Sequence, residues 1–193
     1  MTKHICSAAA ITLAMLLTGC ESSNGGSAKS GILEVQLTDA PGDFESVFVT
    51  IDRVAVHRAS DMNDSNESNE SNSTAGWFTV AEPRGTYDLL TLQNGETTQL
   101  GIGDLAAAKY TQMRLYLGDE SNDSKLHPFA NYVVVDGNAS ALTVPSMTIK
   151  ENHNFTMDEG GVITMTVDFD AEQSIHSAGK KWILNPVLHV TTH

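Results

Sequence analysis

The chain of 193 residues carries 24 acidic and 11 basic residues, a net charge of −13 with histidine neutral. This length accommodates one domain with a hydrophobic core and leaves little room for a second domain. Because like charges repel, the acidic balance argues against nucleic acid and anionic lipid surfaces as partners and favours a cation or a cationic surface. The alternative is that the charge serves only to keep the protein soluble.

The amino terminus has the pattern of an export signal. A short polar start that contains Lys3 precedes an apolar run of eleven residues, Ser7–Leu17. About 20 apolar residues are needed to cross a bilayer as a helix, so this run has the length of a signal-peptide core. It leads directly into Leu17-Thr18-Gly19-Cys20, which resembles the lipobox of bacterial lipoproteins. We therefore predict a lipoprotein signal peptide at residues 1–19 and lipidation of Cys20, with acyl chains such as palmitate; the alternative is a plain cleaved signal with an incidental cysteine.

The residues after the signal predict an anchored protein of the cell envelope. Cys6 lies inside the predicted signal, so Cys20 is the only cysteine of the mature chain and no intramolecular disulfide is available to it. Acyl chains on Cys20 would hold the protein at a membrane. Glu21 follows the cysteine, and by analogy with lipoprotein sorting in enterobacteria it favours the outer over the inner membrane. The Gly- and Ser-rich residues 20–30 predict a lipidated flexible tether.

From Gly31 onward, apolar and polar residues alternate with a period of two, which is typical of strands with one buried face. In one strand the apolar parity changes between Val47-Val49-Ile51 and Val54-Val56, which predicts a β-bulge near Asp52-Arg53. Strands are expected at residues 33–37, 47–56, 77–81, 86–92, 97–102, 110–117, 132–135, 141–144, 148–157, 163–169 and 182–191.

The segments between these strands complete the predicted fold. Asn94-Gly95 and Asp136-Gly137 are typical of hairpin turns, and residues 103–108 and 171–177 have room for a turn or two of helix. Many short strands at this spacing predict an all-β fold over residues 31–191, an antiparallel β-sandwich of the immunoglobulin-like or transthyretin-like kind.

Two polar segments do not fit the core of such a sandwich. Residues 60–75 hold a Ser-Asn-Glu near-repeat with little apolar content, so they cannot repay the entropy of ordering. We predict a disordered hairpin-loop insertion there. The shorter polar segment 119–125 is expected to behave likewise.

Several motifs together resemble one protein family. The chain, over about residues 31–191, resembles the family catalogued as domain of unknown function 4382. This resemblance implies an envelope lipoprotein with a β-sandwich-like domain and brings no established activity. The motifs are, in chain order, Thr38-Asp39-Ala40-Pro41, Val49–His57, Tyr87-Asp88-Leu89-Leu90, Tyr110–Leu115, Asp168-Phe169-Asp170 and Leu184-Asn185-Pro186-Val187.

The sequence favours a protein without enzymatic activity. It contains no Gly-x-Ser-x-Gly elbow, no His-Glu-x-x-His motif and no phosphate-binding glycine loop. A pair of carboxylates acting as a glycosidase has no fixed spacing, so a carbohydrate-active enzyme stays open as an alternative. The leading hypothesis is a non-enzymatic binding or adhesion module with a glycan or envelope-protein partner. The other alternative is a structural component of an envelope protein assembly.

Four aspartates are the candidate metal ligands. Asp39 and Asp43 flank a Pro-Gly turn, while Asp168 and Asp170 share the outward face at the end of a strand. If the two ends meet, four carboxylates would supply the oxygen ligands that Ca²⁺ prefers. The alternative is that Asp39 and Asp43 accept hydrogen bonds from backbone amides in the turn and that Asp168 and Asp170 lie at a solvated edge.

Histidine and aromatic residues offer two further hypotheses. His57 and His189 would form a zinc-binding pair if they lie on neighbouring strands. Aromatic side chains would form a sugar-stacking platform, although cross-strand or core packing is the alternative. The aromatic candidates are Trp77, Trp182, Tyr87, Tyr110, Tyr116 and Tyr132.

Overall fold

The computed structural model describes residues 29–40, 42–59 and 76–193. The predicted signal peptide, the predicted lipidation site at Cys20, most of the predicted tether and the predicted insertion at 60–75 lie outside the described residues. In the described part, no helix is long and apolar enough to span a membrane. The elements, in chain order, are β1 (Ser30–Thr38), β2 (Ser46–Arg58), β3 (Gly76–Ala81), β4 (Gly85–Asp88), the 3-10 helix η1 (Leu89–Leu92), β5 (Thr98–Ala106), β6 (Ala108–Leu117), β7 (Tyr132–Val135), β8 (Asn138–Thr143), β9 (Thr148–Glu151), β10 (Phe155–Met157), β11 (Val162–Phe169), α1 (Ala171–Ser174), β12 (Ile175–Ala178), β13 (Lys181–Leu184) and β14 (Leu188–Thr192).

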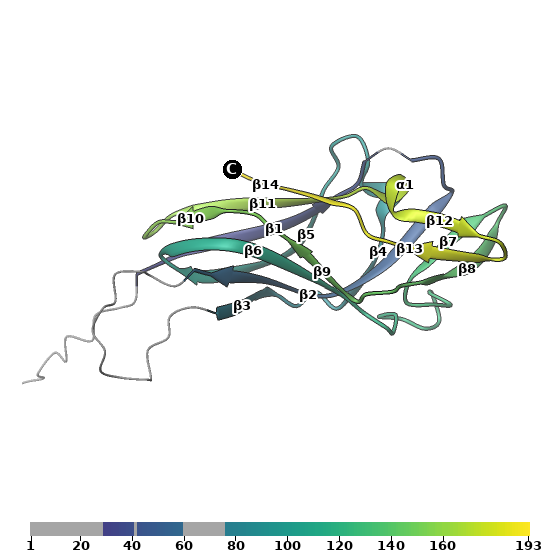
Figure 1. Ribbon diagram of the computed structural model, residues 1–193, viewed down its shortest axis with the longest axis horizontal. Coiled ribbons are helices and arrows are strands. Elements are labelled where there is room, and N and C mark those ends of the chain that lie inside the picture. The colour runs from purple at the N-terminus through teal and green to yellow at the C-terminus, as the bar shows by residue number, and fades with distance from the viewer. Residues whose placement is uncertain (1–28, 41, 60–75) are drawn as a thin grey trace, which may run out of the picture.

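These strands form two sheets that pack face to face, which confirms the all-β sandwich. The small sheet has the order β14-β11-β1-β5. The large sheet has the order β10-β6-β2-β7-β8-β13-β12, with β3 and β4 also paired to β2 and β9 paired to β6. Figure 1 shows the two layers, with β7, β8, β12 and β13 gathered at one end of the molecule.

The core lies between the inner faces of the two sheets. On β1 and β11 every second residue is apolar, and the alternation turns one side chain of each pair inward. The inward residues are fully buried, and each such Val, Leu or Phe contributes roughly 1.5–3 kcal/mol. From the small sheet they are Leu33, Val35, Leu37, Met165, Val167 and Phe169, and from β2 they include Val49, Val54 and Val56.

Both sheets are mixed rather than wholly antiparallel, which is where the structure departs from the predicted sandwich. β1 pairs with β11 in parallel, with Val35 opposite Met165, and β8 pairs with β13 in parallel. Short turns impose antiparallel pairing only on strands that they connect. β1 and β11 are separated by most of the domain, so no turn signal in the sequence determines their relative direction.

The predicted bulge in β2 is confirmed. The register of β2 against β6 shifts between Ile51 and Arg53. Beside the bulge, the buried side chain of Asn131 accepts a hydrogen bond from the Thr50 backbone N–H (3.0 Å) and donates one to the Gly118 carbonyl (2.8 Å). The loop that precedes β7 is thereby tied to the large sheet. Within this loop the N–H groups of Lys125 and Leu126 donate to Asp123, and that of Asn122 donates to the Thr86 hydroxyl, so the expectation that residues 119–125 are disordered is wrong.

Five local predictions need correction. The strand expected at 86–92 ends at Asp88, whose carboxylate accepts hydrogen bonds from the N–H groups of Leu90 and Val47 (both 3.2 Å) and so caps η1. The helix expected at 103–108 is instead the β5–β6 hairpin. The helix expected at 171–177 ends at Ser174, and β12 begins at Ile175. The single strands expected at 148–157 and 182–191 are each interrupted and form two strands, β9 with β10 and β13 with β14.

The glycines of β5 mark a close approach between the two sheets. A Cβ on Gly103 would lie 2.7 Å from the Val80 carbonyl oxygen, and one on Gly101 would lie 2.6 Å from the Ala81 Cβ. The two glycines therefore let β5 of the small sheet approach β3 of the large sheet. At this point the two layers meet more closely than side chains would permit.

Candidate functional site

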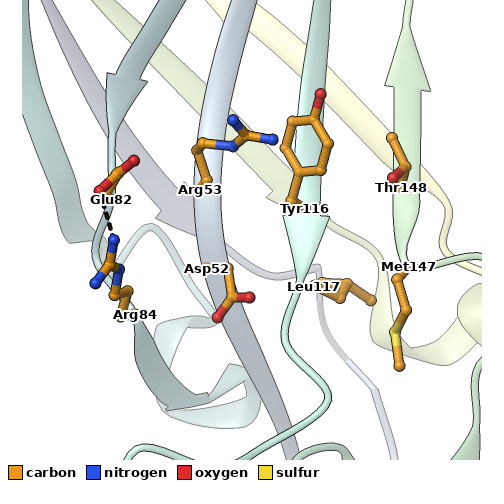
Figure 2. A pocket seen from close by; sticks show the side chains of 8 residues that line it. All are labelled: Asp52, Arg53, Glu82, Arg84, Tyr116, Leu117, Met147 and Thr148. Carbon is orange, nitrogen blue, oxygen red and sulfur yellow. Dashed lines mark hydrogen bonds and ion pairs between the residues drawn. The ribbon is translucent and has the colours of Figure 1, made fainter.

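A groove of about 450 Å³ lies on the outer face of the large sheet, where β2, β6 and the start of β9 pass the β3–β4 turn. Figure 2 shows it from close by. We call it the Arg53 groove. Its lining residues are Asp52, Arg53, Glu82, Arg84, Tyr116, Leu117, Met147 and Thr148.

The strand register places three of these residues in one row. Arg53 of β2 is opposite Tyr116 of β6, and Tyr116 is opposite Thr148 of β9. Their chain neighbours point into the core, so the alternation of the strands turns these three side chains outward. Figure 2 shows them side by side on adjacent strands. The inward neighbours are Val54, Leu115 and Ile149.

The bulge adds Asp52 to the groove. A bulge breaks strict alternation, so the consecutive residues Asp52 and Arg53 both reach the groove. Asp52 lies over Gly118, where an added Cβ would come within 2.8 Å of the Asp52 Oδ1 and 2.7 Å of the Thr50 Cγ2. The absence of a side chain at Gly118 therefore makes room for the carboxylate.

The groove presents hydrogen-bond donors and acceptors around an aromatic ring. The guanidinium carbon of Arg53 lies 4.0 Å from the centroid of the Tyr116 ring, a cation–π contact. Across the groove, Arg84 Nη2 lies 2.8 Å from Glu82 Oε2 in an ion pair that remains exposed to solvent. Guanidinium groups only donate and carboxylates only accept, whereas a sugar hydroxyl does both. The combination suits a ligand rich in hydroxyl groups.

Three of the four candidate calcium ligands do come together. Asp39 is 4 % exposed, and its Oδ1 accepts a hydrogen bond from the Ala171 N–H at 2.9 Å. Asp170 caps α1 by accepting one from the Gln173 N–H at 2.9 Å. Burial raises the pKa of Asp39 to about 6, and the charges of Asp168 and Asp170 act in the same direction.

This cluster is not arranged as a calcium site. Asp43 is exposed, and within the described residues no group of three His, Cys, Asp or Glu side chains is placed to hold a metal ion. Asp39 serves as an acceptor for a backbone amide, as in the alternative reading, but its partner lies in α1 and not in its own turn. The predicted solvated edge is also wrong. Asp170 is buried, and one buried carboxylate oxygen of Asp168 has no hydrogen-bond partner.

The histidine pair is separated by the sandwich itself. His57 belongs to β2 of the large sheet and His189 to β14 of the small sheet, so they do not lie on neighbouring strands and the zinc hypothesis is wrong. The ring of His57 packs against Trp77, with centroids 5.0 Å apart. His189 lies opposite Asp168 in the β11–β14 ladder.

The aromatic residues mostly pack and do not form a platform. Tyr110 stacks on Phe155 and Tyr132 on Phe48, with centroid distances of 5.0 and 4.5 Å. Trp182 contacts Phe44 edge to face, and Tyr87 packs against the core. Only Tyr116 and Trp77 are half-buried on the outer face of the large sheet with a guanidinium group over the ring.

Sequence reasoning did not single out Arg53 or Arg84 as site residues, and it included Tyr116 only among the aromatic candidates. The available signal was the parity change at Asp52-Arg53, which marks the bulge. A bulge re-aims side chains and is common beside functional sites. The partner of Arg53 on β6 depends on the strand register, which no single motif gives.

Comparison with known proteins adds a family. The model of the family described as "Domain of unknown function (DUF4382)" matches residues 30–186, which is most of the chain. No curated protein and no solved structure matches the chain. Because the match covers more than half of the chain, the chain belongs to the DUF4382 family.

Proposed function

We propose that this protein is a lipid-anchored lipoprotein of the bacterial cell envelope, at the outer membrane, whose domain is a non-enzymatic binding module. The anchor is supported by the apolar run that ends in Leu17-Thr18-Gly19-Cys20. The Arg53 groove is the proposed ligand site, and the proposed ligand is a glycan.

One observation carries the glycan proposal. Two guanidinium groups, two carboxylates and an aromatic ring line a groove of about 450 Å³, the lower part of the range typical of small-ligand sites. The carboxylates of Asp52 and Glu82 accept hydrogen bonds from sugar hydroxyls, and the Arg53 guanidinium donates them. The side chain of Met147 adds an apolar wall against which sugar C–H groups pack.

A binding experiment with matched variants tests this role. The full chain, purified in detergent, is applied to a glycan array, and the affinity for the best glycan is measured by calorimetry. Arg53→Gln and Asp52→Asn are each expected to weaken binding at least tenfold. Asp104→Asn is the control, because Asp104 is exposed on β5 of the other sheet. Failure of the wild type to bind any glycan, or equal affinities for all variants, would contradict the proposal.

One alternative has a structural feature in its favour. Asp52 and Glu82 line the same groove, and a pair of carboxylates is what a glycoside hydrolase requires. Incubation of the best glycan with the purified chain, followed by measurement of new reducing ends, separates the two functions. Turnover that is lost in both Asp52→Asn and Glu82→Gln would favour the enzyme over the binding module.

A further inference from the structure

Basic side chains continue from the Arg53 groove along the outer face of the large sheet. Arg114 precedes Tyr116 by two residues on β6, so both side chains stand on the same face, about 7 Å apart. Arg114 is directly opposite Lys150 of β9. We call Arg53, Arg114 and Lys150 the basic strip.

The basic strip is a local reversal of the overall charge. All four arginines of the chain lie on β2, on β6 or in the β3–β4 turn. They are Arg53, Arg58, Arg84 and Arg114. At physiological ionic strength, charges more than about 8 Å apart are largely screened. The strip, and not the net charge of −13, therefore governs what touches this face.

Two of the cations are held in place by aromatic rings. The guanidinium carbon of Arg114 lies 3.7 Å from the centroid of the Trp77 ring, and Arg53 stacks in the same way on Tyr116. A stacked guanidinium keeps N–H donors at its edge, in the geometry that matches the two oxygens of a carboxylate. Because stacking restricts the side chain before binding, less conformational entropy is lost when a ligand arrives.

The strip also lacks partners of opposite charge. Within the described residues, Lys29 and Arg84 form ion pairs, whereas Arg53, Arg114 and Lys150 form none. Arg114 and Lys150 are directly opposite each other in the β6–β9 ladder, so the register places two like charges on one part of this face. An anionic ligand that lies across β6 and β9 would meet both charges.

The adjoining groove narrows the choice of anion. Asp52 and Glu82 accept hydrogen bonds from hydroxyls, so the groove favours an anion that also offers hydroxyl groups over a surface of charged headgroups alone. A ligand that fits both regions carries hydroxyls in the groove and carboxylates along the strip. We infer that the ligand is an acidic polysaccharide, a chain of sugars that bear carboxylates. This inference rests on the proposed glycan-binding role of the groove.

The test compares one polymer with and without its charge. Sodium polygalacturonate and its fully methyl-esterified form are titrated into the full chain in detergent. The variant R114Q/K150Q removes two charges from the strip. K180Q/K181Q removes two charges from the exposed β12–β13 hairpin and is the matched control. Circular dichroism establishes that each variant is folded.

Wild type and control are expected to bind polygalacturonate with equal affinity. The methyl ester is expected to bind at least tenfold more weakly, and R114Q/K150Q is expected to lose at least tenfold in affinity for the acid. R114K keeps the charge without the planar fork and is expected to bind several-fold more weakly. If the double variant does not fold, R114K alone still tests whether Arg114 binds the carboxylates.

Several outcomes would overturn the inference. These are no binding of polygalacturonate by the wild type, equal binding of acid and ester, and equal losses in the two double variants. Binding of phosphatidylglycerol vesicles without binding of polygalacturonate would assign the strip to lipid headgroups instead. Loss of polygalacturonate binding in D52N but not in R114Q/K150Q would leave the groove proposal standing and reject Arg114 and Lys150 as the residues that bind the carboxylates. Loss in R114Q/K150Q but not in D52N would support the acidic ligand and reject the carboxylates of the groove as its binding residues.

Discussion

Asp39 links the end of β1 to the start of α1 through a carboxyl group that is almost fully buried. Burial raises its pKa from 3.8 to about 6, and burial also raises the pKa of Asp168. Between these two pKa values, the Asp39 carboxyl of the folded protein stays protonated, whereas that of the unfolded chain has already lost its proton. The free energy of unfolding therefore falls as pH rises from about 4 to about 6, by roughly 3 kcal/mol for Asp39, and stays lower above that window.

Asp39→Asn tests this effect. The asparagine keeps an oxygen to accept the Ala171 N–H and removes the buried charge. We expect the free energy of unfolding at pH 8 to rise by about 1–3 kcal/mol and its decline between pH 4 and 6 to shrink. Urea denaturation at several pH values measures both quantities, with Asp104→Asn as the exposed control. A decline as steep in the variant as in the wild type would refute the role of Asp39.

Asn131 replaces two missing backbone hydrogen bonds at the bulge of β2. Asn131→Ala would leave the Thr50 N–H and the Gly118 carbonyl buried without their partner, and each such group costs about 1–3 kcal/mol. We expect a loss of about 2–4 kcal/mol in the free energy of unfolding, measured by denaturation. Asn152→Ala, at an exposed position, is the control. A loss no larger than that of the control would show that water replaces the side chain.

At the scale of elements, short-range patterns were sufficient for much of the fold. The alternation in β1, β2 and β11 predicted their buried faces, and the parity change predicted the bulge. The Asp136-Gly137 hairpin also formed, with positive φ at both residues. Each of these features depends on residues close together in the chain, where sequence determines conformation directly.

Contacts between distant segments were not predictable in the same way. The parallel pairing of β1 with β11 and the hydrogen bond from Ala171 to Asp39 join residues more than a hundred positions apart. The Arg53 groove has the same origin, since it depends on which β6 residue faces Arg53. A change of one residue in that register would turn Tyr116 into the core.

The close approach of β3 and β5 yields a prediction about these two elements. In Gly103→Ala the new Cβ would meet the Val80 carbonyl oxygen at 2.7 Å, so the two sheets must separate locally. We expect a cost of about 1–3 kcal/mol, seen as a lower melting temperature. Gly42→Ala is the control because its Cβ would meet nothing closer than 3.4 Å. Equal melting temperatures of Gly103→Ala and the wild type would mean that the two sheets separate locally without cost.

At the scale of the whole molecule, the proposed anchor at Cys20 precedes the first strand of the fold. Both cysteines of the chain, Cys6 and Cys20, precede β1, so the sandwich is held by its core without disulfides. We expect Cys20→Ala to move the protein from the membrane fraction to the soluble fraction without change in melting temperature, as judged by fractionation and circular dichroism. Mass spectrometry of the wild type should find Cys20 acylated. A variant that still sediments wholly with membranes would contradict the lipid anchor.

The position of β1 between β5 and β11 has a consequence for biosynthesis. In the proposed export, β1 would be the first strand to emerge and would gain one neighbour when β5 follows, but its other edge would stay open until β11, near the end of the chain, has emerged. Such long-range closure slows folding, and an open strand edge is a template for aggregation. A chain truncated before Val162 would lack β11 and leave one edge of β1 unpaired. Quality control of this protein would therefore act on such a product, or through a chaperone that shields nascent β1.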